Sequence, residues 1–280
     1  MLKRTVAEWV TIAKISRETG HLFFEGVSDA RVIQHASGYP PNIDFRSSDQ
    51  IEYDTSEGTS FLGGNKLRLV ALSVASNRAN CANIKCVIDG DFAIFTSLSD
   101  RNGCLTQTKF ANLPVHSLEI GWLQGFFLKG YGYVIDSAKW DFIIQTLKFA
   151  FCARYYSANL KNPVAAPNVA DHIKLQNKIA VFDNLSYLRA YFNCTLQGAA
   201  ELCSQVQEYV GMIHSDIRNC VNSNDLFDII YKLLKLNGKI GGSVPASAIR
   251  QAYFSAIDDN VLRGKDFSEL HGWISLYASR

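Results

Sequence analysis

The chain has 280 residues, 48% of them hydrophobic and 19% charged, which is enough apolar material for one large domain or two modest ones. Its formal net charge of +2 argues against a protein that binds nucleic acid through an extensively basic surface, although a local basic groove remains compatible with this charge. The seven cysteines lack zinc-finger spacing and indicate buried, reduced thiols, as expected of a cytoplasmic protein.

The chain begins with an amphipathic segment. Apolar residues at helical spacing predict a helix over residues 5–18. Glu8 and Lys14 interrupt any signal-peptide core, so we expect no such peptide. The sequence has no uninterrupted apolar stretch of about 18 residues, and we therefore expect no transmembrane helix and no membrane partner.

The first predicted strand is Leu22–Glu25, which ends in an acidic residue. Gly26 permits a tight turn, and a helix is predicted from Ser28 through Ala36. Asp29 falls in the first turn of that helix, where the helix dipole favours a negative charge. Asp29 is therefore either a helix-start residue or a substrate-binding candidate.

Alternating strand and helix signals continue up to residue 120. We predict a loop over 38–48, a strand over 50–55, a helix over 65–80 and a buried strand over 84–89. A polar loop over 96–108 follows, before the next candidate strand.

That last candidate strand is Leu113–Ile120. Strands that alternate with helices through short connections predict a parallel sheet with flanking crossover helices. Functional groups of such sheets gather at the C-terminal ends of the strands. Glu25, Asp89, Asp91 and Glu119 all fall at such ends.

Helical periodicity dominates from about residue 136 onward. The predicted helices cover 136–157, 168–182, 186–221, 225–237, 246–257 and 266–278. We therefore predict an α/β catalytic domain over residues 1–134 and an all-helical C-terminal domain over residues 135–280.

The two acidic strand ends predict a metal site. Like charges two residues apart repel each other, and burying them is costly unless a cation lies between them. Asp89 and Asp91 flank Gly90, which lets the backbone bend so that both carboxylates reach one ion. Oxygen ligands without nearby His or Cys suit Mg²⁺ or Mn²⁺. The alternative is that Asp-Gly-Asp is an ordinary turn.

Two further side chains are candidates for substrate contact, each with a simpler interpretation. Lys66 follows a glycine pair and can contact a substrate phosphate, but a lysine in the first turns of a helix is commonly a solvated charge. His116 can assist proton transfer, or it is a histidine without a role. The aromatic run Trp122–Tyr133 can stack on bases, although core or dimer packing is the simpler interpretation.

These motifs resemble the TOPRIM domain of topoisomerases, primases and several nucleases. The resemblance joins Phe24–Gly26 and Asp29 to Ile88–Asp91, a strand ending in Glu-Gly followed by a strand ending in Asp-x-Asp. Other segments resemble the AriB effector nucleases of the PARIS phage-defence system. They are the Gly63-Gly64 turn, His116–Glu119 and Arg263–Asp266.

The resemblance implies roles for individual residues. Glu25 matches the TOPRIM glutamate, which is a metal ligand or the general acid/base. Asp89 and Asp91 match the Asp-x-Asp metal ligands, and Glu119 matches a glutamate that completes or orients the site. We match no tyrosine here to a topoisomerase nucleophile, and the zinc module of primases is absent, so the nuclease branch is favoured.

The expected function is therefore that of a Mg²⁺- or Mn²⁺-dependent TOPRIM nuclease. The resemblance implies a phage-defence toxin that cuts RNA, with tRNA as a candidate, after release from an ABC/SMC-like ATPase, and that is a homodimer when active. One alternative is a DNA endonuclease of the same fold. Another is a non-catalytic binding subunit whose partner supplies the activity.

Overall fold

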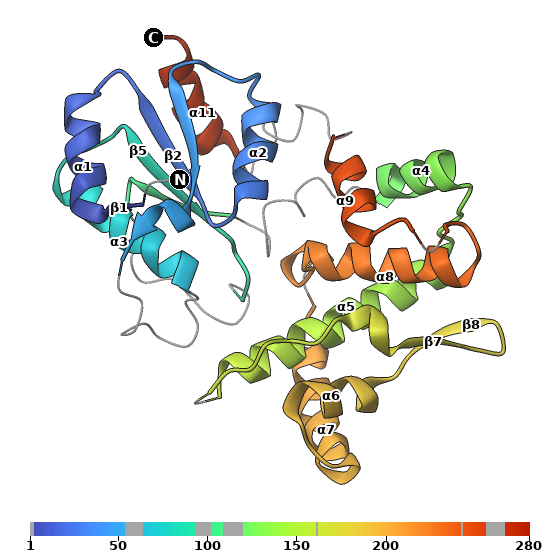
Figure 1. Cartoon of the computed structure of the whole chain (residues 1–280). Helices are drawn as coiled ribbons and strands as arrows, with labels where there is room; N and C mark the ends of the chain where they lie inside the picture. The colour runs from blue at the N-terminus through green and yellow to red at the C-terminus, as the bar shows by residue number, and fades with distance from the viewer. Residues whose placement is uncertain are drawn as a thin grey trace. The chain divides into compact units, whose positions relative to one another are not determined.

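The computed structural model describes residues 3–53, 64–92, 102–108, 120–160, 162–214, 216–241, 243–255 and 267–280. The chain forms two compact units (Figure 1). The first unit combines Met1–His116 with Ala256–Arg280, and the second is Ser117–Ser255. This division differs from the predicted domains 1–134 and 135–280 in its first boundary and in assigning the C-terminal segment to the α/β part of the chain.

The first unit is built on a four-stranded parallel sheet with the strand order β3-β2-β5-β6. The strands are β2 (Gly20–Phe24), β3 (Ile43–Ser47), β5 (Ile84–Ile88) and β6 (Leu105–Gln107). Every residue of β2 and β5 is buried, as expected for central strands covered on both faces. The predicted parallel sheet with flanking helices is confirmed.

Helices cover both faces of this sheet, as Figure 1 shows. On one face, α1 (Val6–Ile15) and α3 (Gly64–Arg78) bury apolar side chains against the strands. On the other face, α2 (Val27–Ala36) and α11 (Ser268–Ala278) do the same. The sheet is thus the middle layer of three, which leaves the ends of its strands as the places where polar side chains can gather.

The C-terminal helix α11 is held to this sheet by specific contacts. The Lys85 ammonium is 3% exposed, pairs with the Glu269 carboxylate and donates to the carbonyl oxygen of Gly103 at 3.0 Å. The Trp273 indole donates to the carbonyl oxygen of Ala82 at 2.9 Å. These contacts, together with the apolar face of α11, place the helix in the first unit and correct the prediction that it belongs to a separate helical domain.

Two strands of the sheet lie in segments that the sequence predicted as loops. β3 falls within the predicted loop 38–48, and β6 falls within 96–108. Both contain polar residues and lie outermost in the four-stranded order. Pairing with a buried neighbour stabilises such short strands, and that is a tertiary effect that local periodicity does not report.

Of the predicted strand 50–55, residues 50–53 are described and only two of them form a strand. Ile51–Glu52 forms β4, which pairs in parallel with β1 (Arg4–Thr5) in a separate two-stranded sheet. A 3₁₀ turn, η1 (Ser48–Gln50), joins β3 to β4. The predicted strand Leu113–Ile120 lies outside the described residues up to residue 119, while Ile120 begins a helix.

The second unit contains helices and one hairpin. The helices are α4 (Ile120–Tyr131), α5 (Ser137–Ala158), α6 (Asn184–Phe192), α7 (Leu196–Met212), α8 (Ser223–Leu236) and α9 (Ala246–Ser255), with 3₁₀ turns η3 (Val169–His172) and η4 (Ile217–Asn219). The predicted continuous helix 186–221 is interrupted at Asn193, which has a φ of 46°.

An antiparallel hairpin replaces the predicted helix 168–182, so the expected all-helical C-terminal domain is wrong. The hairpin pairs β7 (Ile173–Gln176) with β8 (Ile179–Phe182). Asn177 and Lys178 in its two-residue turn both have positive φ, as a type I′ turn requires. None of the described helices is long and apolar enough to cross a membrane.

Candidate functional site

The acidic ends of β2 and β5 meet at one edge of the sheet. These strands are parallel neighbours in the register Phe24↔Val87, so Glu25 and Asp89 follow adjacent strand ends. Glu25 Oε1 accepts a hydrogen bond from the Asp89 backbone N–H at 2.7 Å. The predicted proximity of these two residues is confirmed.

Lys66 reaches the same place from the first turn of α3. Its Nζ donates to the carbonyl oxygen of Asp89 at 2.8 Å and to the Asp91 carboxylate. The same Nζ lies 3.7 Å from Glu25 Oε1. Lys66 is only 6% exposed, so the interpretation of this lysine as a solvated surface charge is wrong.

Burial and like charges make this cluster electrostatically unusual. Burial raises the pKa of Glu25 to about 7, with Lys66 opposing the change and Asp91 and Asp29 adding to it. Burial also raises the pKa of Asp89 well above its ordinary value, and Glu25, Asp29 and Asp91 raise it further. Burial lowers the pKa of Lys66, but Glu25 and Asp91 outweigh that effect, so the net change is upward. Such perturbation is typical of functional clusters, although ion-pair networks also produce it.

Asp29 has a clear structural task. Its Oδ2 accepts a hydrogen bond from the backbone N–H of Gly26 at 3.1 Å, at the start of α2. A Cβ at position 26 would lie 3.1 Å from that same oxygen, tighter than ordinary contact, which accounts for a glycine there. The helix-start interpretation is therefore confirmed, and the Asp29 charge still acts on Glu25 and Asp89.

Two hydroxyl side chains that the sequence analysis missed support the backbone of the site. Ser48, just after β3, donates to the carbonyl oxygen of Glu25 at 2.8 Å. Thr108, just after β6, accepts from the backbone N–H of Gly90 at 2.8 Å. The signal that could have found them is their position after strand ends, but neither strand was predicted.

The cluster offers oxygen atoms of the chemical kind that a hard divalent cation prefers. The carboxyl groups of Glu25, Asp29 and Asp91 all raise the pKa of Asp89, and the Lys66 ammonium opposes them. Carboxylate and carbonyl oxygens are the ligands that Mg²⁺ and Mn²⁺ prefer. Within the described ranges, however, no group of three or more His, Cys, Asp or Glu side chains is arranged to hold an ion. The Lys66 ammonium contacts the oxygens that an ion would use.

Two predicted site residues, Glu119 and His116, lie outside the described residues, as do Gly63 and the segment Arg263–Asp266. The aromatic run falls largely in α4 of the second unit, where Leu123 and Phe127 are fully buried. The core interpretation is confirmed for these two side chains.

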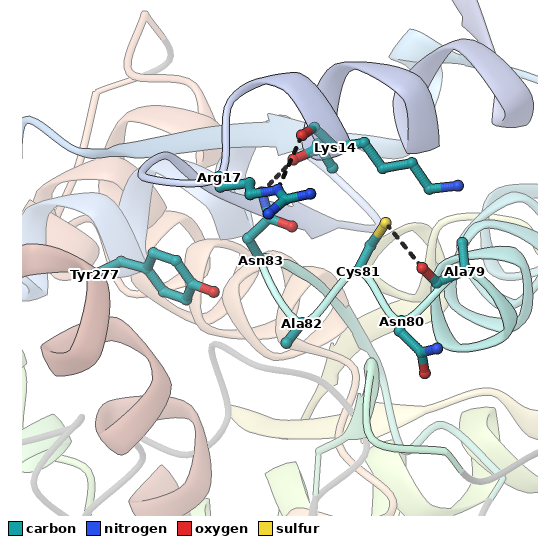
Figure 2. Close-up of a pocket in the computed structure, with 9 residues that line it drawn as sticks. Lys14, Arg17, Ala79, Asn80, Cys81, Ala82, Asn83 and Tyr277 are labelled. Carbon is teal, nitrogen blue, oxygen red and sulfur yellow. Dashed lines mark hydrogen bonds between the residues drawn. The ribbon is translucent and has the colours of Figure 1, made fainter.

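A pocket with a volume of about 490 Å³ lies at the opposite ends of the strands (Figure 2). Its walls come from the C-terminal ends of α1 and α3, from the connection into β5 and from α11. The residues that line it are Ala13, Lys14, Arg17, Ala79, Asn80, Cys81, Ala82, Asn83 and Tyr277. Lys14 and Arg17 lie near the C-terminus of α1, where positive charge is favoured by the helix dipole, so these two charges have a structural explanation.

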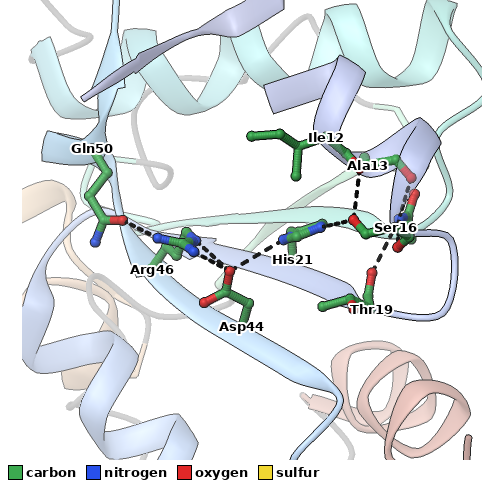
Figure 3. Close-up of polar contacts among 9 residues, drawn as sticks. Ile12, Ala13, Ser16, Thr19, His21, Asp44, Arg46 and Gln50 are labelled. Carbon is green, nitrogen blue, oxygen red and sulfur yellow. Dashed lines mark hydrogen bonds and ion pairs between the residues drawn. The ribbon is translucent and has the colours of Figure 1, made fainter. Parts of the chain in front are cut away.

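A partly buried series of polar contacts links three elements of the same unit (Figure 3). Ser16 Oγ lies 3.0 Å from His21 Nε2, and His21 Nδ1 lies 3.5 Å from Asp44 Oδ2. The order Ser-His-Asp is that of hydrolase triads. However, the Ser16 hydroxyl donates to a carbonyl oxygen of α1 at 2.7 Å, and His21 is 3% exposed. We interpret these contacts as a tie between α1, β2 and β3.

No protein-family model matches this chain, and a comparison with curated proteins finds no match. The interpretation of the site therefore depends on its geometry and on the motif resemblance.

Proposed function

We propose that this chain is a metal-dependent TOPRIM nuclease with Glu25, Asp89 and Asp91 as its catalytic carboxylates. The observation that carries the proposal is the meeting of these side chains at the C-terminal edge of a parallel sheet, where such folds bind their ligands. The carboxyl groups at this edge raise one another's pKa values, and a bound cation would favour their charged forms.

The three carboxylates would hold Mg²⁺ or Mn²⁺, with Glu119 as a further ligand. When bound, such an ion neutralises negative charge that develops on the phosphate oxygens and lowers the pKa of the attacking water. Glu25, whose pKa is raised to about 7 mainly by burial, is suited to accept or donate a proton at neutral pH. Its link to the Asp89 backbone fixes its orientation.

The choice of substrate and biological role is carried by the resemblance to the AriB nucleases. On that basis the substrate is RNA, with tRNA as the first candidate. The chain acts as a phage-defence effector held inactive by an ABC/SMC-like ATPase, and it acts as a homodimer once released. His116 and Lys66 are candidates for substrate contact in this proposal.

A cleavage assay tests both the chemistry and the substrate. Purified protein is incubated with tRNA and with DNA, in Mg²⁺ and in EDTA, beside the variant Asp89→Asn. We expect cleavage of tRNA in Mg²⁺ alone and its loss in the variant. Asp141→Asn, which changes an exposed aspartate of α5, is the matched control and should cleave normally.

The alternatives give different results in the same assay. Cleavage of DNA alone would favour the DNA endonuclease. A protein that cleaves neither substrate, and whose toxicity in cells is unchanged by Glu25→Ala, would favour a non-catalytic binding subunit. Sequencing of RNA ends from cells that express wild type or Glu25→Ala would identify the cleaved RNA.

A further inference from the structure

The Lys66 ammonium has the oxygen surroundings of a bound cation. Three oxygens face it: the carbonyl oxygen of Asp89 at 2.8 Å, a carboxylate oxygen of Asp91, and Glu25 Oε1 at 3.7 Å. The first two accept hydrogen bonds from the ammonium, and the third is an ion-pair contact beyond hydrogen-bond distance. They belong to residues that follow the ends of two adjacent strands, while Lys66 itself comes from a helix.

This arrangement differs from an ordinary surface ion pair. The Lys66 side chain is 8% exposed, whereas the Asp91 side chain is 44% exposed. The ammonium is therefore enclosed, and the cluster opens to solvent on the side of Asp91. An ion that enters from solvent meets Asp91 first and then the oxygens that Lys66 already contacts.

Glu25 and Asp91 are also ligands in the function proposed above. A divalent ion close to both would lie within a few ångströms of a positive charge, and like charges at such a distance repel strongly in a partly buried site. The ammonium and a divalent ion cannot both occupy the gap between Glu25 and Asp91, because each would have to contact the same oxygen atoms.

We propose that the Lys66 ammonium and a divalent cation are alternative occupants of the gap between Glu25 and Asp91, so that Lys66 sets the affinity for the metal and leaves the gap when the metal binds. This inference rests on the proposed function for the presence of the metal. In the absence of metal, Lys66 compensates the carboxylates and keeps the strand ends together. In its presence, the lysine side chain turns out of the cluster.

Metal binding to a charge-deleted variant tests the competition. Calorimetry with Mn²⁺ is carried out on wild type and on Lys66→Met, which keeps the apolar stem but removes the charge. We expect the variant to bind Mn²⁺ about tenfold more tightly or better. The double variant Lys66→Met with Glu25→Gln should lose this gain.

Lys85→Met is the matched control. Among the described residues of the first unit, Lys85 is a second buried lysine that pairs with a carboxylate, and its partner Glu269 is in α11. This substitution removes a buried ammonium that does not contact the cluster, so the Mn²⁺ affinity of the variant should equal that of wild type. An equal gain in both variants would mean that the effect of Lys66→Met is a general loss of positive charge, and would overturn the proposal.

Amine labelling of the wild-type protein keeps the test independent of how well Lys66→Met folds. Acetylation with mass-spectrometric readout should find Lys66 protected relative to the exposed Lys14 without metal, and more reactive after Mn²⁺ is added. Mn²⁺ binding with unchanged Lys66 reactivity and unchanged affinity in Lys66→Met would overturn the inference but leave the proposed metal site intact. If Mn²⁺ binds neither to wild type nor to Lys66→Met, the inference is overturned and the metal is removed from the proposed function. RNA cleavage that persists in EDTA would contradict the metal dependence of the proposed function alone.

Discussion

The charge state of Glu25 should make the first unit less stable as the pH rises through neutrality. Burial, with help from Asp91 and Asp29, raises the pKa of Glu25 from 4.5 to about 7. A carboxyl with a raised pKa binds its proton more tightly in the folded state than in the unfolded state. Its contribution to stability is therefore fully present below about pH 4.5 and is lost as the pH rises to about 7.

Glu25→Gln removes this penalty. The difference between a pKa of about 7 and one of 4.5 corresponds to about 3 kcal/mol at about 1.4 kcal/mol per unit. Glutamine keeps an oxygen that can accept the Asp89 N–H. In EDTA, the variant should match wild type at pH 4.5 and exceed its free energy of unfolding by about 3 kcal/mol at pH 8.

Urea unfolding between pH 4.5 and pH 8.5 measures this difference. Hydrogen exchange of the buried β2 and β5 amides confines the readout to the first unit, since the second unit has its own core. Glu52→Gln, which changes an exposed glutamate of β4, is the control and should leave the pH dependence unchanged. A Glu25→Gln protein that is less stable than wild type at pH 8 would refute the reasoning, because attraction to Lys66 would then outweigh burial.

Two other substitutions test the supporting structure. Thr108→Val removes the acceptor for the buried Gly90 N–H, so it should lower the free energy of unfolding of the first unit by about 1–3 kcal/mol in chemical denaturation and weaken Mn²⁺ binding. Unchanged stability and unchanged Mn²⁺ affinity would mean that water replaces the hydroxyl at no cost. Arg154 and Asp225 form an ion pair between α5 and α8, and the Asp225 side chain is only 11% exposed. Arg154→Met leaves this carboxylate without its partner and should lower the free energy of unfolding by about 3–5 kcal/mol. Adding Asp225→Leu should recover much of that loss, and failure to do so would show that the ion pair is not the source of the cost.

The sequence predicted the central strands and the meeting of the acidic residues, because both follow from local patterns. β2 and β5 contain the apolar runs Leu22–Phe24 and Cys86–Ile88, and parallel strands bring their C-terminal ends to one edge. β3 and β6 lack such runs, so they join the sheet only because they pair with β2 and β5, and this pairing cannot be read from the residues of a short sequence segment.

The position of Lys66 could not be read from the sequence. Its contacts lie 23 and 25 residues away, at the far end of another strand, and only the packing of α3 on the sheet brings them together. A lysine in a first helical turn has no local signal that separates burial from exposure. The hairpin β7–β8 was missed for a related reason, since its turn residues Asn177 and Lys178 take positive φ without a glycine.

The most direct test of the central claim is single-turnover cleavage of a labelled RNA by wild type and by Glu25→Gln at neutral pH. The account predicts cleavage by wild type in Mg²⁺, none in EDTA, and a rate at least about a hundredfold lower in the variant even though its fold is more stable. Cleavage by Glu25→Gln at the wild-type rate, or cleavage by wild type that persists in EDTA, would contradict a metal-dependent site built on these carboxylates.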